Sequence, residues 1–435
     1  MHWVVCLLCA LGGLGIVAIC SLFPGLHVAH LATLLLPLAS GAQPILPPEG
    51  LAFAFVGMAS GHAMLHTLPG IFCAVPDEAG LLVVQPGRKY LLAGKGTEAA
   101  LLCSLGGLGG TIVLLLLAPL AVRWLPPLYA LLQPHFPWML WAIIAYLLLS
   151  EWSKDSGRAP AGLPRLWATW KPLLAGLLTF LLAGLLGLVL SYRSPLPSWG
   201  KAGGLAPAFI GLFGLPWLLL GVSKHAPLPP QDTRCELEID PGEWLRGVLA
   251  GAAGGFFAAL FPALTAGVGV LLAGQGFGER EGRAFLVSQG ACRVTYSLGS
   301  LLLFFVPGMW KVKGGFASPL STVYTEASPR AGCLALGTAM LCSAFAFLFS
   351  LPLGRFLARI SLRRLQQASL LLVLLILGAT SGPAGLFVAL VATAIGAIPL
   401  LWGTRRTNAL GLVLLPVALN LSGIGERLAA WLGLL

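Results

Sequence analysis

Residues 21–37 read SLFPGLHVAHLATLLLP and place a Pro-Gly pair and two histidines inside an otherwise apolar stretch. A proline inside a helix removes one backbone donor and clashes with the preceding turn, while glycine adopts backbone angles that other residues avoid. Amides and carbonyls freed in this way are costly where they face lipid, so they are tolerated where they line a cavity or a binding site. The stretch therefore predicts a helix that is broken at Pro24 and Gly25, or a re-entrant hairpin with its tip there.

The composition of the whole chain indicates that lipid surrounds this stretch. Of 435 residues, 57% are hydrophobic and 9% are charged, and the mean hydropathy is +0.90, whereas a soluble domain carries roughly 25% charged residues. The apolar runs lack the alternation that a barrel strand needs, so we expect an all-α polytopic membrane protein of the plasma membrane. At about 20 residues a span, the length allows on the order of ten spans, of which the first begins near the N-terminus and is retained.

The charge and the cysteines exclude other classes of protein. The net charge of +11 is explained by basic loops that hold cytoplasmic helix ends in place, so no nucleic-acid partner is expected. Many of the nine cysteines, among them Cys6 and Cys9, lie in or beside apolar runs. We expect them to be small buried residues, and we predict neither a cofactor nor a metal site from them.

One polar connection and two broken stretches divide the chain. The connection, residues 223–244, separates a first membrane half with accessory spans, residues 1–222, from a second half, residues 245–435. The broken stretches are residues 23–39 and 261–274. We expect other helices over residues 3–22, 51–75, 97–121, 138–150, 173–190, 205–222, 245–260, 284–305, 331–351, 368–379, 384–401 and 410–421.

The two broken stretches resemble each other, which indicates an internal repeat. Residues 12–36 read GGLGIVAICSLFPGLHVAHLATLLL, and residues 250–274 read AGAAGGFFAALFPALTAGVGVLLAG. Carriers build substrate sites from paired broken helices whose half-helix N-termini point at an anion. The alternative is that each proline only kinks its helix. The substrate-site residues predicted from these stretches are Pro24, Gly25, Pro262, Ala263 and Thr265.

Four segments carry a resemblance to a known family. They are FPGLHVAHLATLLLP at residues 23–37, residues 68–121 with a Pro-Gly pair, an acidic patch and a glycine-rich helix, APAFIGLFGLPWLLLGV at residues 206–222, and LFPALTAGVGVLLA at residues 260–273. In this order they resemble the TctA family, the large membrane subunit of tripartite tricarboxylate transporters, and most closely its archaeal branch. The likeness spans most of the chain.

The resemblance implies a carrier for organic anions such as citrate or other carboxylates. Such a carrier is driven by an ion gradient and served by a soluble binding protein and a small membrane subunit. Ala263 stands where the family has the glycine of its second motif, and residues 287–308 replace an acidic and asparagine-rich run of many bacterial members. The coupling-ion chemistry is therefore not carried over, and archaeal relatives commonly lack obvious partner subunits.

Four histidines lie in two pairs within apolar sequence. His27 and His30 follow the first break, and His62 and His66 lie four residues apart on the next predicted span, so each pair shares one helix face. Histidine titrates near neutral pH, which makes all four candidates for a proton relay and makes His27 and His30 candidate substrate contacts. The alternative is that they hydrogen-bond neighbouring helices. A four-histidine metal site is not predicted, because no carboxylate or cysteine is placed to support it.

Arg293 lies in the polar run SQGACRVTYSLGS, residues 288–300, between apolar sequences. A guanidinium at membrane depth is costly, and its forked donors suit a carboxylate or a phosphate. Arg293 is therefore a predicted substrate contact, together with Gln289 and Thr295. Alternatively, Arg293 extends along its helix to the membrane surface.

Two further features are interpreted as structural. Lys95 and Thr97 precede a long predicted span and are expected to cap it rather than to bind an anion. The glycine-rich stretch LGGLGG, residues 105–110, allows close helix packing, and without a preceding strand it is not a nucleotide-binding motif.

These features together predict a secondary-active transporter of a small organic anion, bound near mid-membrane between two broken helices. A transporter or flippase of a phosphorylated lipid such as polyprenyl phosphate is the alternative, and a lateral opening to lipid between the breaks would favour it. An enzyme is not predicted, because no nucleophile with an adjacent base and no carboxylate cluster is found. Other partners left open are a proton or sodium ion, membrane lipids, an accessory binding protein and a second copy of the chain.

Overall fold

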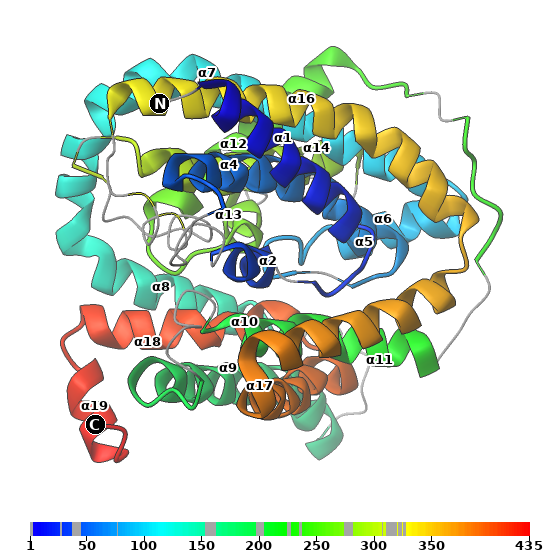
Figure 1. Cartoon of the computed structure of the whole chain (residues 1–435). Helices are drawn as coiled ribbons and strands as arrows, with labels where there is room; N and C mark the ends of the chain where they lie inside the picture. Colours follow the sequence, from blue (N-terminus) through cyan, green and yellow to red (C-terminus); the bar gives the residue numbers. More distant parts are fainter. Residues whose placement is uncertain are drawn as a thin grey trace. The chain divides into compact units, whose positions relative to one another are not determined.

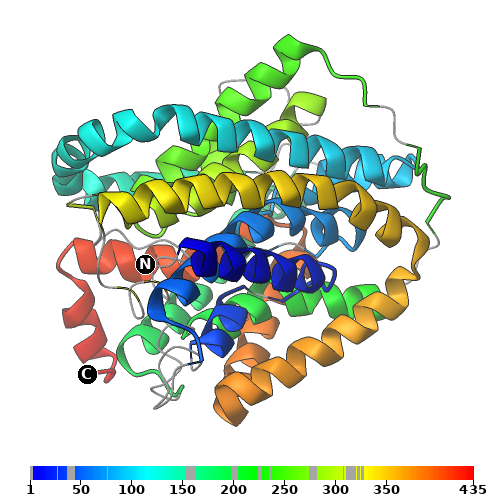
Figure 2. The same cartoon turned by 45° about the horizontal axis from the view of Figure 1, so that its top comes forward.

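The computed structural model describes residues 3–26, 28–36, 45–75, 77–152, 162–196, 204–223, 228–234, 237–273, 282–306, 308–309, 320, 324 and 328–435. Over these residues the chain is helical and contains no strand, which confirms the predicted fold class (Figure 1, Figure 2). Seven of the described helices are long and apolar enough to cross a membrane, or eight if one bent pair counts as a span. The chain is therefore a multi-pass membrane protein.

Both predicted breaks are present. α1 (Trp3–Cys20) ends before Pro24 and α2 (Val28–Leu35) begins after it, while α12 (Pro241–Leu260) ends before Pro262 and α13 (Ala266–Ala273) follows. The residue after each proline has a positive φ, +85° at Gly25 and +66° at Ala263. Glycine adopts this region readily, but alanine does so at a steric cost. The two motifs therefore place a left-handed residue at the same position of the break.

In the described part of the chain, the same succession of helices surrounds each break. A helix leads into the break, a short helix follows it, and a longer helix comes next: α4 (Pro48–Leu65) after the first break and α14 (Arg283–Leu303) after the second. α1 packs against α4, and α12 packs against α14. A Cβ atom at Gly57 would lie 1.8 Å from the Ala10 oxygen, and one at Gly251 would lie 2.3 Å from the Ser288 oxygen. This order agrees with the sequence repeat, and the division into halves at residues 223–244 stays a prediction.

The chain forms two compact units that do not follow these halves. Unit 1 comprises Met1–Tyr129 and Trp217–Ile376 and contains both breaks, and unit 2 comprises Ala130–Pro216 and Leu377–Leu435. The other helices of unit 1 are α5 (Thr67–Phe72), α6 (Val84–Leu92), α16 (Pro329–Arg359) and parts of α7 (Gly96–Leu132), α11 (Leu215–Ser223) and α17 (Leu362–Trp402). Unit 2 adds η1 (Gln133–His135), α8 (Phe136–Leu149), α9 (Leu163–Tyr192), α10 (Ala206–Phe209), η4 (Ile210–Gly214), η5 (Arg406–Leu410), α18 (Gly411–Leu421) and α19 (Gly425–Trp431).

One helix is longer than the sequence predicts. α7 continues beyond residue 121 to Leu132 and contains three prolines, Pro119, Pro126 and Pro127. The element α17 contains the predicted spans 368–379 and 384–401, which are separated by non-helical backbone at Gly382, where φ is 64°. Prolines are tolerated in membrane helices where neighbouring groups satisfy the freed carbonyls. Conversely, α12 and α14 were predicted as spans and are not among the seven apolar helices. Each carries charged side chains, Glu243 and Arg246 in α12 and two arginines in α14.

In unit 1, α7 and α14 approach each other backbone to backbone. A Cβ atom at Gly106 of α7 would lie 1.9 Å from the Val287 oxygen, and one at Gly290 of α14 would lie 1.7 Å from the Cys103 oxygen. No side chain fits at either position. The structural interpretation of the stretch at residues 105–110 is therefore confirmed.

In unit 2, a polar contact joins the end of α8 to the segment that begins at Arg405. The buried Glu151 carboxylate accepts hydrogen bonds from the Arg405 amide at 3.0 Å and from Asn408 Nδ2 at 3.1 Å. Arg405 Nη1 also donates to Ser150 Oγ at 2.7 Å. These bonds fix η5 against α8.

Candidate functional site

Unit 1 contains a buried ion pair between α14 and the loop that follows α5. Arg293 of α14 is 1% exposed, and Asp77 of the loop is 8% exposed. Arg293 Nη1 donates to Asp77 Oδ1 at 2.7 Å, and Nη2 donates to Oδ2. Bidentate pairs of this kind are the stronger form of ion pair. The alternative that Arg293 extends to the membrane surface is wrong, because its guanidinium has a buried partner.

Two histidines of α4 face the same carboxylate. His62 Nε2 lies 3.7 Å from Asp77 Oδ2, and the His62 and His66 rings stack with centroids 4.6 Å apart. Both histidines are buried. The helices α4 and α14, which are the long helices of the two repeats, contact each other. Four side chains therefore form one group between them, here called the Asp77 cluster: Asp77, Arg293, His62 and His66. The expectation that no carboxylate supports these histidines is therefore wrong.

The loop holds Asp77 in a fixed orientation. The Gly80 amide donates to Asp77 Oδ1 at 2.7 Å, and a Cβ atom at Gly80 would lie 2.7 Å from Arg293 Nη1. Burial acts to raise the pKa of the Asp77 carboxyl, but the Arg293 guanidinium outweighs it and holds that pKa well below its ordinary value. Asp77 is therefore a carboxylate at neutral pH.

Three groups of the cluster also meet the distance requirement of a metal site. One ligand atom each from His62, His66 and Asp77 lies within 4.8 Å of the others. Both Asp77 oxygens, however, are already bonded to a guanidinium, whose positive charge opposes a divalent cation at the same place. We therefore interpret the cluster as an ionisable group of side chains and not as a metal centre.

The start of α13, directly after the second break, packs near this ion pair. Thr265 directly precedes α13, and its carbonyl accepts hydrogen bonds from two amides of the first turn. A Cβ atom at Gly267 would lie 3.0 Å from the Glu78 oxygen, and Cys292 Sγ donates to the Ala266 oxygen at 3.4 Å. The start of α13 therefore contacts both the Asp77 loop and α14. The structure thus places Thr265, which directly precedes Ala266, beside α14, and the predicted roles of Pro262 and Ala263 in substrate binding stay predictions.

Three buried polar atoms of this region have no hydrogen-bond partner among the residues that the structure describes. They are Thr265 Oγ1, Gln289 Nε2 and Arg293 Nε. The two nitrogens are donors, and the hydroxyl can donate, so the unused capacity suits a ligand that accepts hydrogen bonds. Thr295 differs, because its hydroxyl already donates to the Ala291 oxygen at 2.8 Å. Its predicted role in substrate binding stays a prediction.

The first break has apolar neighbours. Pro24 is buried, and a Cβ atom at Gly25 would lie 2.9 Å from Leu218 Cδ1. His27 lies outside the described residues, and so does the side chain of His30. Their predicted roles as substrate contacts and proton carriers stay predictions.

The start of α7 differs from the predicted cap. The Thr97 hydroxyl has no partner among the described residues, while the Gly96 amide donates to Gln231 Oε1 at 3.0 Å. Lys95 Nζ lies 3.5 Å from Glu98 Oε2 of the first turn of α7. The capping prediction for Thr97 is therefore wrong, because a glutamine of the polar connection takes its place.

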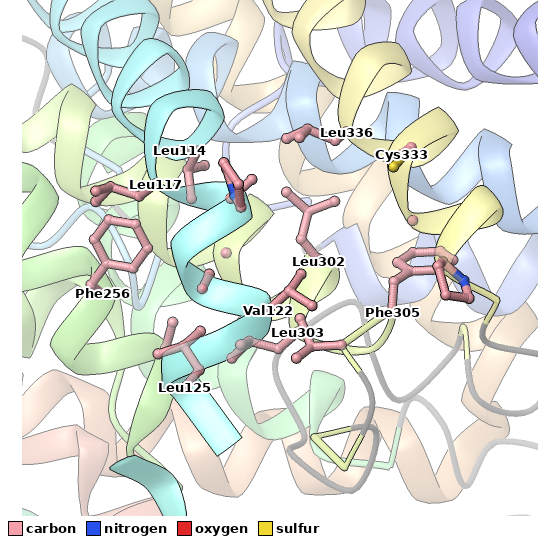
Figure 3. A pocket seen from close by; sticks show the side chains of 18 of the residues that line it. Leu114, Leu117, Val122, Leu125, Phe256, Leu302, Leu303, Phe305, Cys333 and Leu336 are labelled. Carbon is pink, nitrogen blue, oxygen red and sulfur yellow. The ribbon is translucent and has the colours of Figure 1, made fainter. Parts of the chain in front are cut away.

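An apolar pocket of about 460 Å³ lies elsewhere in unit 1, between α7, α12, α14 and α16. Figure 3 shows Val122, Leu302 and Leu303 at its centre, with Phe256 on one side and Leu336 and Phe305 on the other. Leu260 also lines the pocket and is the last residue of α12, directly before the second break. The pocket therefore reaches the break from its apolar side.

Broken helices in matching repeats, with a buried ionisable cluster between the repeated helices, are the architecture of membrane carriers. Sequence comparison agrees with this class, since residues 7–411 match the Tripartite tricarboxylate transporter TctA family. The chain belongs to the TctA family. This family transports tricarboxylate-type substrates, and its members are large subunits that work with a binding protein and a small subunit. The chain is accordingly a multi-pass protein of the plasma membrane.

A relative from an archaeon supports the predicted branch. The chain is similar to the uncharacterized protein MJ1079 of Methanocaldococcus jannaschii, with 24% identity over 305 residues, which are 68% of each chain. No solved structure matches the chain.

Proposed function

We propose that this protein is a secondary-active transporter of a di- or tricarboxylate-like anion, which binds in unit 1 between α14, the Asp77 loop and the second break. The observation that supports this most strongly is the set of buried donors, Thr265 before α13 and Gln289 and Arg293 on α14, that have no partner among the described residues. A helix N-terminus carries a partial positive charge, and the same region supplies a hydroxyl, an amide and a guanidinium N–H. All of these groups favour an acceptor with negative charge.

Each residue has a distinct part in the proposed site. Thr265 and the first amides of α13 bind one carboxylate, because they lie at the positive end of the helix dipole. Gln289 and Arg293 Nε lie one turn apart on α14 and bind a second carboxylate or a hydroxyl of the substrate. Asp77 holds the Arg293 fork, so Arg293 Nε is the part of this guanidinium that stays available. A multivalent anion can therefore join α13 to α14.

The experiment is a binding and uptake assay with purified protein. We expect citrate or another di- or tricarboxylate to raise the unfolding temperature by mass action, and proteoliposomes to accumulate it under an ion gradient. Thr265→Val should weaken binding by about tenfold or more, since a hydrogen bond to a charged group contributes about 1.5–3 kcal/mol. Thr179→Val is the matched control, because this hydroxyl is buried in unit 2 and donates to its own helix. Absence of binding by every carboxylate would overturn the proposal.

A second candidate function is supported by the apolar pocket. A transporter of a lipid phosphate needs room for a hydrocarbon chain beside a site for its head group, and the pocket adjoins the second break at Leu260. Leu336→Trp, which fills the pocket, would then abolish stabilisation by a short-chain polyprenyl phosphate and leave citrate binding unchanged. Leu348→Trp is the control, since Leu348 is an exposed residue of the same helix. An accessory binding protein, a small subunit and self-association are further proposals that co-purification would test.

A further inference from the structure

One face of α14 leads from the proposed anion site to the apolar pocket. Gln289, Arg293 and Tyr296 follow one another at the spacing of one helix turn, and Leu303 lies two turns beyond Tyr296, so all four share this face. Gln289 and Arg293 carry donors of the proposed site, whereas Leu303 lines the pocket. Tyr296 therefore lies on this face between the anion site and the pocket.

Tyr296 packs against two apolar clusters, one at each of these places. The first cluster contains Ala79 of the loop that carries the ion pair and Ala266 at the start of α13. The second contains Ala259 and Leu303, which both line the pocket. Of the described residues in the two clusters and around them, Tyr296 alone packs against both. Its side chain therefore contacts the surroundings of the ion pair and also the residues of the pocket wall.

The hydroxyl group of Tyr296 lies toward the ion pair. Among the groups that act on it electrostatically are Glu78 and Asp77, the two acidic residues of the loop. A tyrosine has an apolar ring and a polar end, so it can border a polar site on one side and hydrocarbon on the other. Tyr296 thus has the chemical character that a wall between the two places requires.

We propose that Tyr296 determines which anions the site accepts, because its ring separates the donors of α13 and α14 from the apolar pocket. The protein then takes short polar carboxylates and rejects carboxylates that carry a hydrocarbon chain. This rests on the proposed function and names the substrate class of the same site. A hydrocarbon chain on a substrate bound at Arg293 would have to displace a ring that is packed on two sides, and closely packed side chains shift only at a cost in free energy.

Removal of the ring would join the anion site to the pocket. The pocket has a volume of about 460 Å³, which falls within the range of about 300–1,000 Å³ for sites that hold small molecules. In Tyr296→Ala a hydrocarbon chain on the substrate can pass Ala259 and enter this volume. Its transfer from water would then add to the affinity instead of opposing it.

The experiment compares ligands that differ only in a hydrocarbon chain. The probes are succinate and citrate, each paired with the derivative in which a hexyl group replaces a hydrogen on carbon, and calorimetry on the purified full chain gives the affinities. We expect the unmodified protein to bind the hexyl derivative at least about tenfold more weakly than its parent. In Tyr296→Ala the order should reverse, with the hexyl derivative bound at least about tenfold more tightly than its parent.

The control variants test the ring and the pocket separately. Tyr296→Phe keeps the ring and should keep the preference of the unmodified protein. Leu336→Trp, added to Tyr296→Ala, fills the pocket and should abolish the gain of the hexyl derivative. Tyr146→Ala, at a partly buried tyrosine of unit 2, should behave as the unmodified protein. Tyr296→Leu is a smaller change that should reduce the preference, and it replaces the alanine variant if that variant does not fold.

The outcomes separate this inference from the function on which it rests. If the unmodified protein binds the hexyl derivative as tightly as its parent or more tightly, the inference is wrong and a carboxylate carrier remains. The inference is also wrong if Tyr296→Ala weakens both ligands by the same factor, because a residue with a purely structural role has this effect. No binding of succinate, citrate or any other carboxylate would overturn the proposed function as well.

Discussion

At the first break Gly25 has a φ of +85° and packs against Leu218 and Val373. At the second break Ala263 has a φ of +66°, and α13, which follows it, contacts the loop that carries a buried ion pair through Gly267. The two motifs therefore produce the same local turn in different surroundings. Proline and the left-handed residue after it determine the turn. The neighbouring helices determine which chemical groups the turn meets.

The comparison indicates that the two repeats contribute different chemical groups. In the part of the chain that the structure describes, the unpartnered donors Thr265 Oγ1, Gln289 Nε2 and Arg293 Nε belong to the second repeat. The first repeat contributes α4 with His62 and His66. We infer that the second repeat supplies anion contacts and that the first supplies the two histidines of α4.

The largest effect is expected from removal of Arg293, which belongs to the buried ion pair. Arg293→Ala leaves the Asp77 carboxylate buried without its partner, so we expect a loss of about 3–5 kcal/mol in the free energy of unfolding. Denaturant unfolding of the purified protein measures this loss.

Arg283→Ala is the matched control on the same helix. Its guanidinium pairs with Glu98 at 3.3 Å and is about one-third exposed, so the loss should stay below about 1 kcal/mol. Equal losses for the two variants would show that the buried pair contributes no more than a surface pair. Adding Asp77→Asn to Arg293→Ala should recover part of the stability, because the unpaired charge is removed.

A smaller effect is expected at the first break. Gly25→Ala forces an alanine into a left-handed conformation and brings its Cβ to 2.9 Å from Leu218 Cδ1, so we expect a loss of about 1–2 kcal/mol. The midpoint of thermal unfolding reports it. Gly12→Ala, inside α1 and with no atom within 4 Å of its Cβ, should be neutral or slightly stabilising. A neutral Gly25→Ala would mean that the first break tolerates alanine as the second one does.

The smallest effect is the reverse exchange at the second break. Ala263→Gly relieves the steric cost of the positive φ but increases the freedom of the unfolded chain, so the two contributions nearly cancel. We expect a change within about 0.5 kcal/mol by the same thermal measurement. A clear loss would show that the Ala263 methyl group makes packing contacts that a glycine cannot replace.

The sequence predicts the class of protein and both breaks because these depend on local composition and on Leu-Phe-Pro motifs. It does not predict the ion pair, because Asp77 and Arg293 are 216 residues apart and meet only in the folded protein. The signal was present, since an arginine in apolar sequence needs an acidic partner and residues 77–78 are acidic within a short segment after an apolar run. The separation of the helices predicted over residues 368–379 and 384–401 is confirmed, because the backbone at Gly382 between them is non-helical, with a φ of 64°.

The glycine contacts of unit 1 restrict how a carrier of this kind can change its access. Where Gly290 meets Cys103 and Gly251 meets Ser288, main-chain atoms touch without intervening side chains, so sliding would produce steric clashes. We therefore expect α12, α14 and the part of α7 that belongs to unit 1 to move together. Conformational rearrangement must then be absorbed at hinges, and the two interrupted helices provide them at the points where regular hydrogen bonding is already absent.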